Sequence, residues 1–323
     1  MTEITSTPKL VTVFGGSGFV GRHVVRALAR RGYQVRVACR RPNLAFHLQP
    51  LGNVGQIHAV QANLRNRASV DRAVAGADHV INLVAIMNES GKQTYNAVQV
   101  FGARAVAEAA RAAGAGLTHF SAIGADKNSP AGYARAKALG EEAVLETVPG
   151  AVILRPSIVF GPEDDFLNRF AEMSRFSPFL PLIGGGETKF QPVFVGDLAE
   201  AVARSVDGTV AAGTYEIGGP EVLSFRDCME TMLEIIDRKR MLVTLPWGVA
   251  KLMGKVFGLL PGKLITADQV ELLKVDNVVS PEAKAAGRTL EGLGITGRTI
   301  EALAPSWMWK FRPAGQFTRK GHA

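Results

Sequence analysis

The sequence predicts an α/β protein built on a doubly wound parallel sheet. Three glycines with the spacing G-x-x-G-x-x-G, at Gly15, Gly18 and Gly21, follow an apolar, β-branched run at residues 9–14. Strand-like segments then alternate with amphipathic helical segments as far as residue 155, which is the order of a parallel sheet with helices on both faces. A chain of 323 residues is long enough for this core and a smaller second lobe.

The glycine segment predicts a strand that turns into a phosphate-binding helix. Gly15 can adopt backbone angles that a side chain forbids, Gly18 lets the main chain approach a pyrophosphate, and Gly21 lets the helix lie close to the strand. Free N–H groups at the start of the helix then face the anion. The alternative is a structural turn that binds nothing. The predicted contacts of this turn with a dinucleotide are Gly15, Ser17, Gly18, Phe19, Val20 and Gly21.

The other elements of the sheet follow in order. A helix at residues 19–31, closed by Gly32, and a strand at 34–39 complete a βαβ unit of roughly 30 residues. We expect further strands at 56–61, 79–85, 117–121 and 151–155, with helices at 68–75, 94–113 and 133–146. These elements give the six parallel strands of a Rossmann fold, with ligands beyond the carboxyl ends of the strands.

From Pro156 onward, prolines and glycines interrupt the alternation, and we expect a smaller, mostly helical C-terminal lobe. Residues 192–195 and 214–217 are predicted to return to the sheet, with a helix at 197–206 between them. Helices are predicted at 224–238 and 245–260. The expected division is a core at 8–235 with loops of the second lobe at 156–190, a lobe at 236–310 and a basic tail at 311–323.

Composition narrows the class of protein. Residues 1–30 contain no uninterrupted apolar segment, so we expect neither a signal peptide nor a membrane span, and a cytoplasmic location. Cys39 and Cys228 provide no disulfide framework, and the six histidines show no metal-ligand spacing. We therefore expect no bound metal. The formal charge of +8 is accompanied by no nucleic-acid motif, so we also expect no nucleic acid as a ligand.

The end of the second strand distinguishes between the two nicotinamide dinucleotides. An NAD site usually carries a carboxylate about 20 residues after the glycines, where it holds the ribose 2′-hydroxyl. This chain has Arg40 and Arg41 there, and guanidinium groups pair with a 2′-phosphate. The sequence therefore favours NADP(H), the alternative being two solvated arginines in a loop.

Tyr133 and Lys137 form a second constellation. A spacing of four places both side chains on one face of a helix. A phenol with an ordinary pKa of about 10 is a poor acid–base catalyst at neutral pH, and a nearby ammonium lowers that pKa. The pair directly follows the fifth strand, where a substrate would meet the dinucleotide.

With these motifs the chain resembles the extended and atypical branch of the short-chain dehydrogenase/reductase superfamily over residues 9–235. Further matches are Asn82-Leu-Val-Ala85, Val193-Phe-Val-Gly-Asp197-Leu-Ala and Tyr215-Glu-Ile-Gly-Gly-Pro220. Within that branch, residues 120–126 and the string from Arg155 to Arg169 resemble the NADPH-binding accessory subunit family of respiratory complex I and its bacterial relatives.

The resemblance implies roles at matching positions. Tyr133 is then the proton donor or acceptor, and Lys137 holds the ribose hydroxyls. Asn63 and Leu64 flank the adenine, with asparagine in place of the more usual aspartate. The resemblance places three more residues beside the cofactor: Val84, Ala85 and Pro156.

One position departs from the pattern of active enzymes. Extended members usually carry a Ser or Thr that orients the substrate carbonyl two residues after the position of Ser121, and that place is Ile123. Ser121 itself is the substitute candidate, although a serine near a strand end also hydrogen-bonds to backbone. Either Ser121, Tyr133 and Lys137 form a working catalytic set, or the cofactor pocket is retained without catalysis.

Residues 245–260 combine a broad apolar face with Lys251 and Lys255, and such a helix can lie on a membrane surface, dock to a partner or cap its own lobe. Trp307 and Trp309 before the basic tail are a second candidate contact. The leading hypothesis is an NADP(H)-binding accessory or assembly subunit of a proton-pumping NADH:quinone oxidoreductase, peripheral on the cytoplasmic face of the inner membrane. The alternative is an active NADPH-dependent reductase or epimerase/dehydratase.

Overall fold

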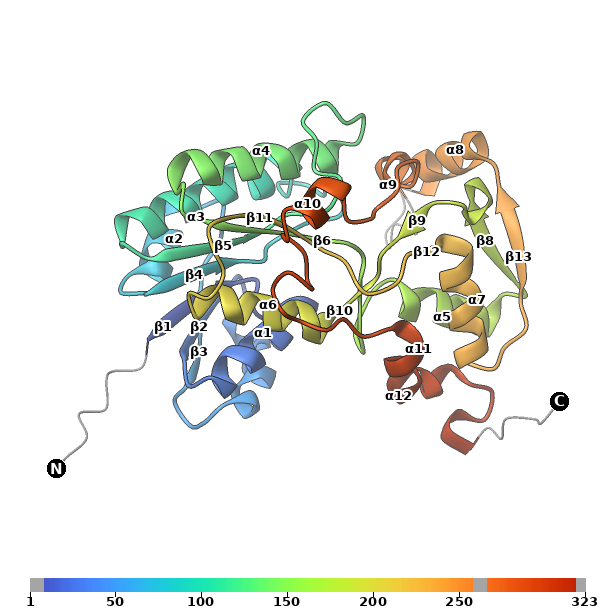
Figure 1. Ribbon diagram of the computed structural model, residues 1–323, viewed down its shortest axis with the longest axis horizontal. Helices are drawn as coiled ribbons and strands as arrows, with labels where there is room; N and C mark the ends of the chain where they lie inside the picture. The colour runs from blue at the N-terminus through green and yellow to red at the C-terminus, as the bar shows by residue number, and fades with distance from the viewer. Residues whose placement is uncertain (1–8, 258–265, 318–323) are drawn as a thin grey trace.

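A seven-stranded parallel sheet forms the centre of the N-terminal part of the molecule (Figure 1). The computed structural model describes residues 9–257 and 266–317. The strand order is β11-β6-β5-β4-β1-β2-β3, so β1 lies inside the sheet, with β2 and β3 added on one side of it and β4, β5, β6 and β11 on the other. The strands are β1 (Leu10–Phe14), β2 (Gln34–Cys39), β3 (Ile57–Gln61), β4 (His79–Asn82), β5 (Gly116–Phe120), β6 (Val152–Pro156) and β11 (Gly213–Ile217).

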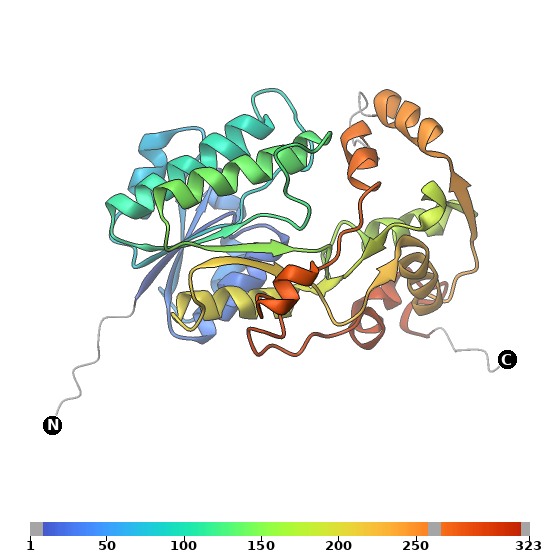
Figure 2. The same ribbon diagram turned by 45° about the horizontal axis from the view of Figure 1, so that its top comes forward.

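Helices cover both faces of this sheet (Figures 1 and 2). On one face, Val24 and Leu28 of one helix and Leu198 of another pack against Val13 and Val37 of the strands. On the other face, a second buried cluster joins three helices to the sheet. The first face carries α1 (Phe19–Arg30) and α6 (Val195–Val206), and the second carries α2 (Arg67–Val74), α3 (Phe101–Ala112) and α4 (Gly132–Thr147). A π-helical turn at Asn96–Val100 precedes α3.

The predicted doubly wound α/β fold is confirmed, and one of the two predicted returns to the sheet is observed. β11 pairs with β6 as a seventh strand and places Tyr215 opposite Leu154. The return of residues 214–217 to the sheet is thus confirmed, whereas that of residues 192–195 is wrong. β10 (Val193–Phe194) instead pairs with β7 (Val159–Phe160) in a separate ladder. Both edges of β6 are already occupied, by β5 and β11.

The C-terminal lobe lies beside the carboxyl ends of the strands and is mostly helical (Figure 1). Its short strands pair as β8 with β13, in parallel, and as β9 with β12, antiparallel. The elements are α5 (Leu167–Phe176), β8 (Phe179–Ile183), β9 (Lys189–Phe190), β12 (Leu223–Ser224), α7 (Phe225–Ile235), β13 (Met241–Leu245), α8 (Trp247–Phe257), α9 (Ala267–Leu272), α10 (Pro281–Ala285), α11 (Ile300–Leu303) and α12 (Pro305–Met308). Within the described ranges, no helix is long and apolar enough to cross a membrane.

Residues before and after position 235 contribute to the apolar core of both the sheet and the C-terminal lobe. Phe225 and Met229 of α7 belong to the apolar cluster of the C-terminal lobe, whereas Leu290 and Ile295 pack into the core of the sheet. The predicted helix at 224–238 corresponds to α7. The predicted helix at 245–260 corresponds to α8, and residues 258–260 lie outside the described residues.

Asp197 connects α6 to the segment that precedes α11. Its carboxylate is buried and accepts hydrogen bonds from the backbone N–H of Arg298 at 3.0 Å and from Nε of the same residue at 2.8 Å. The Arg298 guanidinium also lies 4.6 Å from the centroid of the Phe194 ring. A buried charge needs such a partner, so this pair fixes the path of residues 290–298 across the sheet.

Candidate functional site

A cleft of about 1350 Å³ runs along the carboxyl ends of the strands and under the C-terminal lobe. This is the edge where doubly wound sheets bind ligands. Nearly all residues that the sequence analysis proposed for the site line this one cleft. They are Gly15, Ser17, Gly18, Phe19, Val20, Gly21, Arg40, Asn63, Leu64, Val84, Ala85, Ser121, Tyr133, Lys137 and Pro156.

The glycine turn has the geometry that its spacing predicts. Gly15 has a φ of +80°, and the N–H of Gly18 donates to the carbonyl oxygen of Gly15 at 3.1 Å. A Cβ atom on Gly21 would lie only 2.2 Å from that same carbonyl oxygen. The first turn of α1 therefore packs directly on the strand end, and its N–H groups open toward the cleft.

The two arginines after β2 differ in position. Arg40 lines the cleft, whereas Arg41 is absent from its lining, so the structure supports Arg40 as a site residue more directly than Arg41. Arg41 directly precedes a 3₁₀ turn at Pro42–Leu44, and this turn carries the chain away from the cleft. Arg65, which follows β3, also lines the cleft and was not among the predicted site residues.

Two asparagines shape the loops beside the turn. The Oδ1 atom of Asn63 accepts a hydrogen bond from the N–H of Arg65 at 3.1 Å. The Oδ1 atom of Asn82 accepts one from the N–H of Val84 at 3.2 Å. Such side chain to backbone bonds hold the loop in a turn, so Val84 is positioned from the end of β4.

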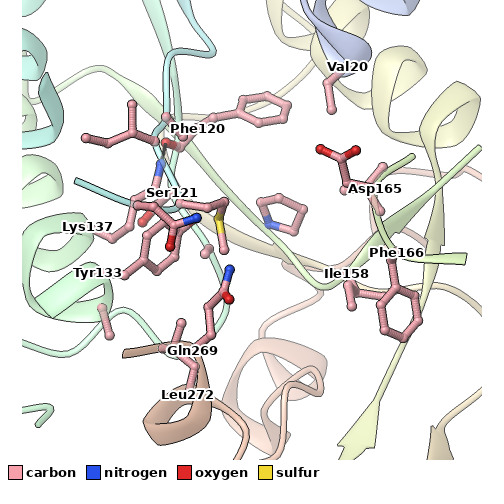
Figure 3. A pocket seen from close by; sticks show the side chains of 18 of the residues that line it. Val20, Phe120, Ser121, Tyr133, Lys137, Ile158, Asp165, Phe166, Gln269 and Leu272 are labelled. Atoms are coloured by element: carbon pink, nitrogen blue, oxygen red, sulfur yellow. Dashed lines mark hydrogen bonds between the residues drawn. The ribbon is translucent and has the colours of Figure 1, made fainter. Parts of the chain in front are cut away.

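Tyr133 and Lys137 lie side by side on α4, with Ser121 close by at the end of β5 (Figure 3). The Nζ atom of Lys137 donates to the carbonyl oxygen of Phe120 at 2.9 Å and lies 5.8 Å from the centroid of the Tyr133 ring. Ser121 Oγ is buried and has no hydrogen-bond partner among the described residues. A buried hydroxyl without a hydrogen-bond partner is energetically costly. The Ser121 hydroxyl can therefore form a hydrogen bond to a ligand in the cleft.

Burial dominates the ionisation of this pair. It lowers the pKa of Lys137 to about 8, against the opposing effect of the Glu141 carboxylate. It raises the pKa of the Tyr133 phenol to about 12, whereas the sequence analysis expected the neighbouring ammonium to lower it. Desolvation disfavours the charged form of either group, so Tyr133 is protonated at neutral pH and a weak acid–base group.

Ile123 occupies the cleft at the position where extended enzymes carry a hydroxyl. Its N–H donates to the carbonyl oxygen of Pro156 at 3.1 Å, and its own carbonyl oxygen accepts from Nδ2 of Asn277 at 3.1 Å. The backbone is thus fully engaged, and the side chain adds only apolar surface. This position supplies no hydrogen bond to a substrate carbonyl.

Asp268 lies next to the site, outside the cleft lining, and was not predicted from the sequence. Its carboxylate accepts hydrogen bonds from the N–H groups of Gly132 at 2.6 Å and Tyr133 at 3.0 Å, and from the hydroxyl of Tyr95 at 3.2 Å. A negative charge at a helix N-terminus is stabilising. Asp268 thereby attaches α9 to the start of α4.

A local signal for α9 was present in the sequence. Thr266 and Gln269 form a capping box, which is the pattern Thr-x-x-Gln that marks the start of a helix. The contact with α4 spans 136 residues of chain, and no local pattern predicts it. Among the described residues, no group of three or more His, Cys, Asp or Glu is placed to hold a metal ion.

The chain is similar to several known proteins. The chain is 36% identical over 288 residues, 85% of its length and 72% of the relative, to the mitochondrial NADH dehydrogenase (ubiquinone) 1 alpha subcomplex subunit 9 of Arabidopsis thaliana. The rat protein of the same name is 33% identical over 90% of this chain and 78% of its own. A ceramide reductase of Caulobacter vibrioides is 35% identical over 55% of either chain.

Among solved structures, the NADPH-dependent quinone oxidoreductase QOR2 of Escherichia coli, determined with NADPH, has the same fold. The TM-score is 0.71, with 19% sequence identity, over 92% of this chain and 98% of that one. A profile of the NAD dependent epimerase/dehydratase family matches residues 11–218, which include every predicted site residue. The chain therefore belongs to the NAD dependent epimerase/dehydratase family, in the extended branch of the short-chain dehydrogenase/reductase superfamily, and is homologous to subunits of respiratory complex I.

Proposed function

We propose that this protein is an NADP(H)-binding accessory or assembly subunit of a proton-pumping NADH:quinone oxidoreductase, in which the cofactor is mainly structural. One combination of observations carries the proposal: the cleft keeps its glycine turn, whereas its reactive end has Ile123 in place of a hydroxyl and a Tyr133 phenol with a pKa of about 12. Cofactor binding is retained in such a site and acid–base catalysis is weakened.

Bound cofactor stabilises a subunit by mass action. A ligand that binds only the native state adds RT ln(1 + [L]/Kd), about 2.7 kcal/mol at a hundredfold excess over Kd. The dinucleotide would touch the loops after β1 to β6 together, so it would hold the sheet edge and the adjoining lobe in one arrangement. That arrangement is the surface offered to the rest of the complex.

The relatives support a place in complex I, and α8 supplies a surface for docking there. Val249 and Leu252 are 46% and 64% exposed, and Lys251 lies between them in sequence. Lys251 pairs with the Glu271 carboxylate at 2.7 Å and is half exposed. Exposed apolar side chains beside such a lysine suit the edge of an anionic membrane or a partner subunit. The proposed location is peripheral, on the cytoplasmic face of the inner membrane. Residues 318–323 of the basic tail lie outside the described residues.

Co-migration tests the proposed assembly. After native electrophoresis of mildly solubilised membranes, we expect the protein in the band that has NADH:quinone oxidoreductase activity. Deleting its gene should reduce the amount of fully assembled complex. A protein found wholly in the soluble fraction, with the complex unchanged by the deletion, would contradict the proposal.

The proposed preference for NADP(H) rests on Arg40. Replacing Arg40 with alanine is expected to weaken NADPH binding about tenfold or more, because it removes a charged partner of the 2′-phosphate, and to leave NADH binding almost unchanged. Arg41→Ala is the matched control, since Arg41 does not line the cleft. Titrations of both nucleotides by fluorescence measure the effect. Equal losses for NADPH and NADH in Arg40→Ala would refute the 2′-phosphate contact.

The second candidate is an active NADPH-dependent reductase or epimerase/dehydratase. The convergence of Tyr133, Lys137 and the unpartnered Ser121 hydroxyl in one cleft favours it, because hydride transfer to a carbonyl would then accompany proton transfer from Tyr133. Oxidation of NADPH on addition of a carbonyl compound, lost in Tyr133→Phe with cofactor binding intact, would support it over a structural cofactor.

A further inference from the structure

The cleft extends well beyond the region that a dinucleotide needs. Its volume of about 1350 Å³ exceeds the roughly 300–1,000 Å³ of a site for one drug-sized ligand. The glycine turn, Arg40 and Asn63 line one half, whereas side chains from α5, β8, β13, α8 and α9 line the other. The cleft therefore has space for a second ligand at the reactive end.

The second half has an apolar lining. We call it the apolar chamber and define it by Phe166, Phe170, Ile183, Leu245, Met253 and Leu272. In Figure 3, Phe166 lies across the cleft from Leu272 and Tyr133. Apolar side chains around a concave surface favour an apolar ligand, because its burial removes both surfaces from water.

The chamber wall is preformed. The Phe166 ring contacts the rings of Phe170, Phe190 and Phe225, with centroid separations of 5.8, 6.0 and 6.0 Å. Phe190 and Phe225 are buried in the cluster of the C-terminal lobe. The partly buried rings of Phe166 and Phe170 are thus held by buried ones, and the wall does not need to reorganise when a ligand enters.

Unpaired polar atoms occur at the other end, near the cofactor half. Ser121 Oγ and Asn88 Oδ1 are buried, line the cleft and have no hydrogen-bond partner among the described residues. Together with the Tyr133 hydroxyl they suit one small polar group. The lining thus changes from polar atoms at Tyr133 to mainly apolar side chains at Met253 and Leu245, with Gln269 and Glu271 of α9 as polar members of that wall.

We propose that the apolar chamber binds the tail of a long-chain carbonyl or alcohol compound, whose head reaches Ser121 and Tyr133. The inference rests on the proposed function, because the head would lie beside the bound dinucleotide. Compounds with a fatty-acyl chain and compounds with an isoprenoid chain both have this chemistry, because each can carry a small polar head on a long apolar tail.

Calorimetric titration of the NADPH-saturated full-length protein tests the proposal. The tailed probes are 2-dodecanone and a ubiquinone with two isoprene units, and the tail-free probes are 2-butanone and the same quinone without its chain. We expect a tailed probe to bind at least tenfold more tightly than its tail-free counterpart, with a negative heat-capacity change from apolar burial. The tighter of the two tailed probes identifies the type of chain.

Met253→Gln places an amide of nearly the same size in the chamber and is expected to weaken binding of the tailed probe about tenfold, with NADPH affinity unchanged. Leu252→Gln is the matched control, since Leu252 is 64% exposed on the same helix and does not line the cleft. The proposal of an apolar chamber would be overturned if Met253→Gln bound the tailed probe with wild-type affinity, or if the wild type bound tailed and tail-free probes equally tightly. Absence of NADPH binding in the wild type would instead overturn the proposed function.

Discussion

Gly21→Ala is expected to abolish dinucleotide binding and to lower the free energy of unfolding by about 3 kcal/mol or more. A Cβ atom there would lie 2.2 Å from the carbonyl oxygen of Gly15 and 2.6 Å from two backbone atoms of Gly16. Backbone atoms cannot swing aside as the end of a flexible side chain can. The whole first turn of α1 must then move away from β1, and the N–H groups that face the cleft move with it.

Denaturant unfolding and NADPH titration measure the two effects of Gly21→Ala separately. Gly150→Ala is the control, because a Cβ at Gly150 would meet no atom within 4 Å, and a surface substitution of this kind changes stability by about 0.5 kcal/mol or less. The close approach of helix and strand would be disproved by a Gly21→Ala protein that unfolds at the wild-type denaturant concentration and still binds NADPH.

Most of the cofactor half of the site was predictable from sequence because topology positions it. In a parallel sheet every strand ends at the same edge, so residues directly after a strand, such as Ser17, Asn63 and Val84, must meet there once the strands are identified. No side-chain direction is needed for this conclusion. This reasoning does not extend to Arg41, because the 3₁₀ turn at Pro42–Leu44 directly follows it and sets the direction of the chain there.

The residues that were missed depend on distant parts of the chain. Asp268 reaches the start of α4 from the C-terminal lobe, and Arg298 reaches Asp197 from 101 residues away. Both pairs depend on how the lobes pack, which periodicity does not encode. The wrong prediction at residues 192–195 has a related reason, since β10 pairs with β7 across α5 and β8 and not with the main sheet.

The ionisation of Tyr133 was wrongly predicted for a different reason. Spacing alone placed an ammonium near the phenol and suggested a lowered pKa, whereas the balance between attraction and desolvation depends on burial. In the folded chain desolvation dominates for both groups, which raises the pKa of Tyr133 and lowers that of Lys137. A bound dinucleotide would change that balance by adding its own charges and excluding water.

Lys137→Met is expected to stabilise the cofactor-free protein by about 2 kcal/mol at pH 7. The side chain of Lys137 is only 3% exposed, and burial lowers its pKa from 10.5 to about 8. That difference corresponds to about 3 kcal/mol of destabilisation below pH 8. The substitution also removes the donor to the carbonyl oxygen of Phe120, which costs about 1 kcal/mol.

The pH dependence of Lys137→Met distinguishes this cause from a general packing effect. Between pH 8 and 10.5 the unfolded wild type still binds the lysine proton and the folded protein has released it, so wild-type stability from this group rises with pH. The advantage of the variant should therefore shrink from pH 8 upward, disappear at about pH 9.5 and become a deficit of about 1 kcal/mol above about pH 10.5, where only the lost hydrogen bond remains. Urea unfolding of both proteins without cofactor gives the difference, in which groups common to both, such as Tyr133 and Cys228, largely cancel.

NADPH should reverse the order of stability. If Lys137 holds the ribose, saturating cofactor stabilises the wild type by mass action and stabilises Lys137→Met much less. Parallel pH profiles for the two proteins would refute the burial argument, whereas equal stabilisation by NADPH would refute the cofactor contact. A buried lysine that destabilises the empty protein and stabilises the loaded one couples folding of this subunit to its nucleotide, as expected of a cofactor whose role is structural.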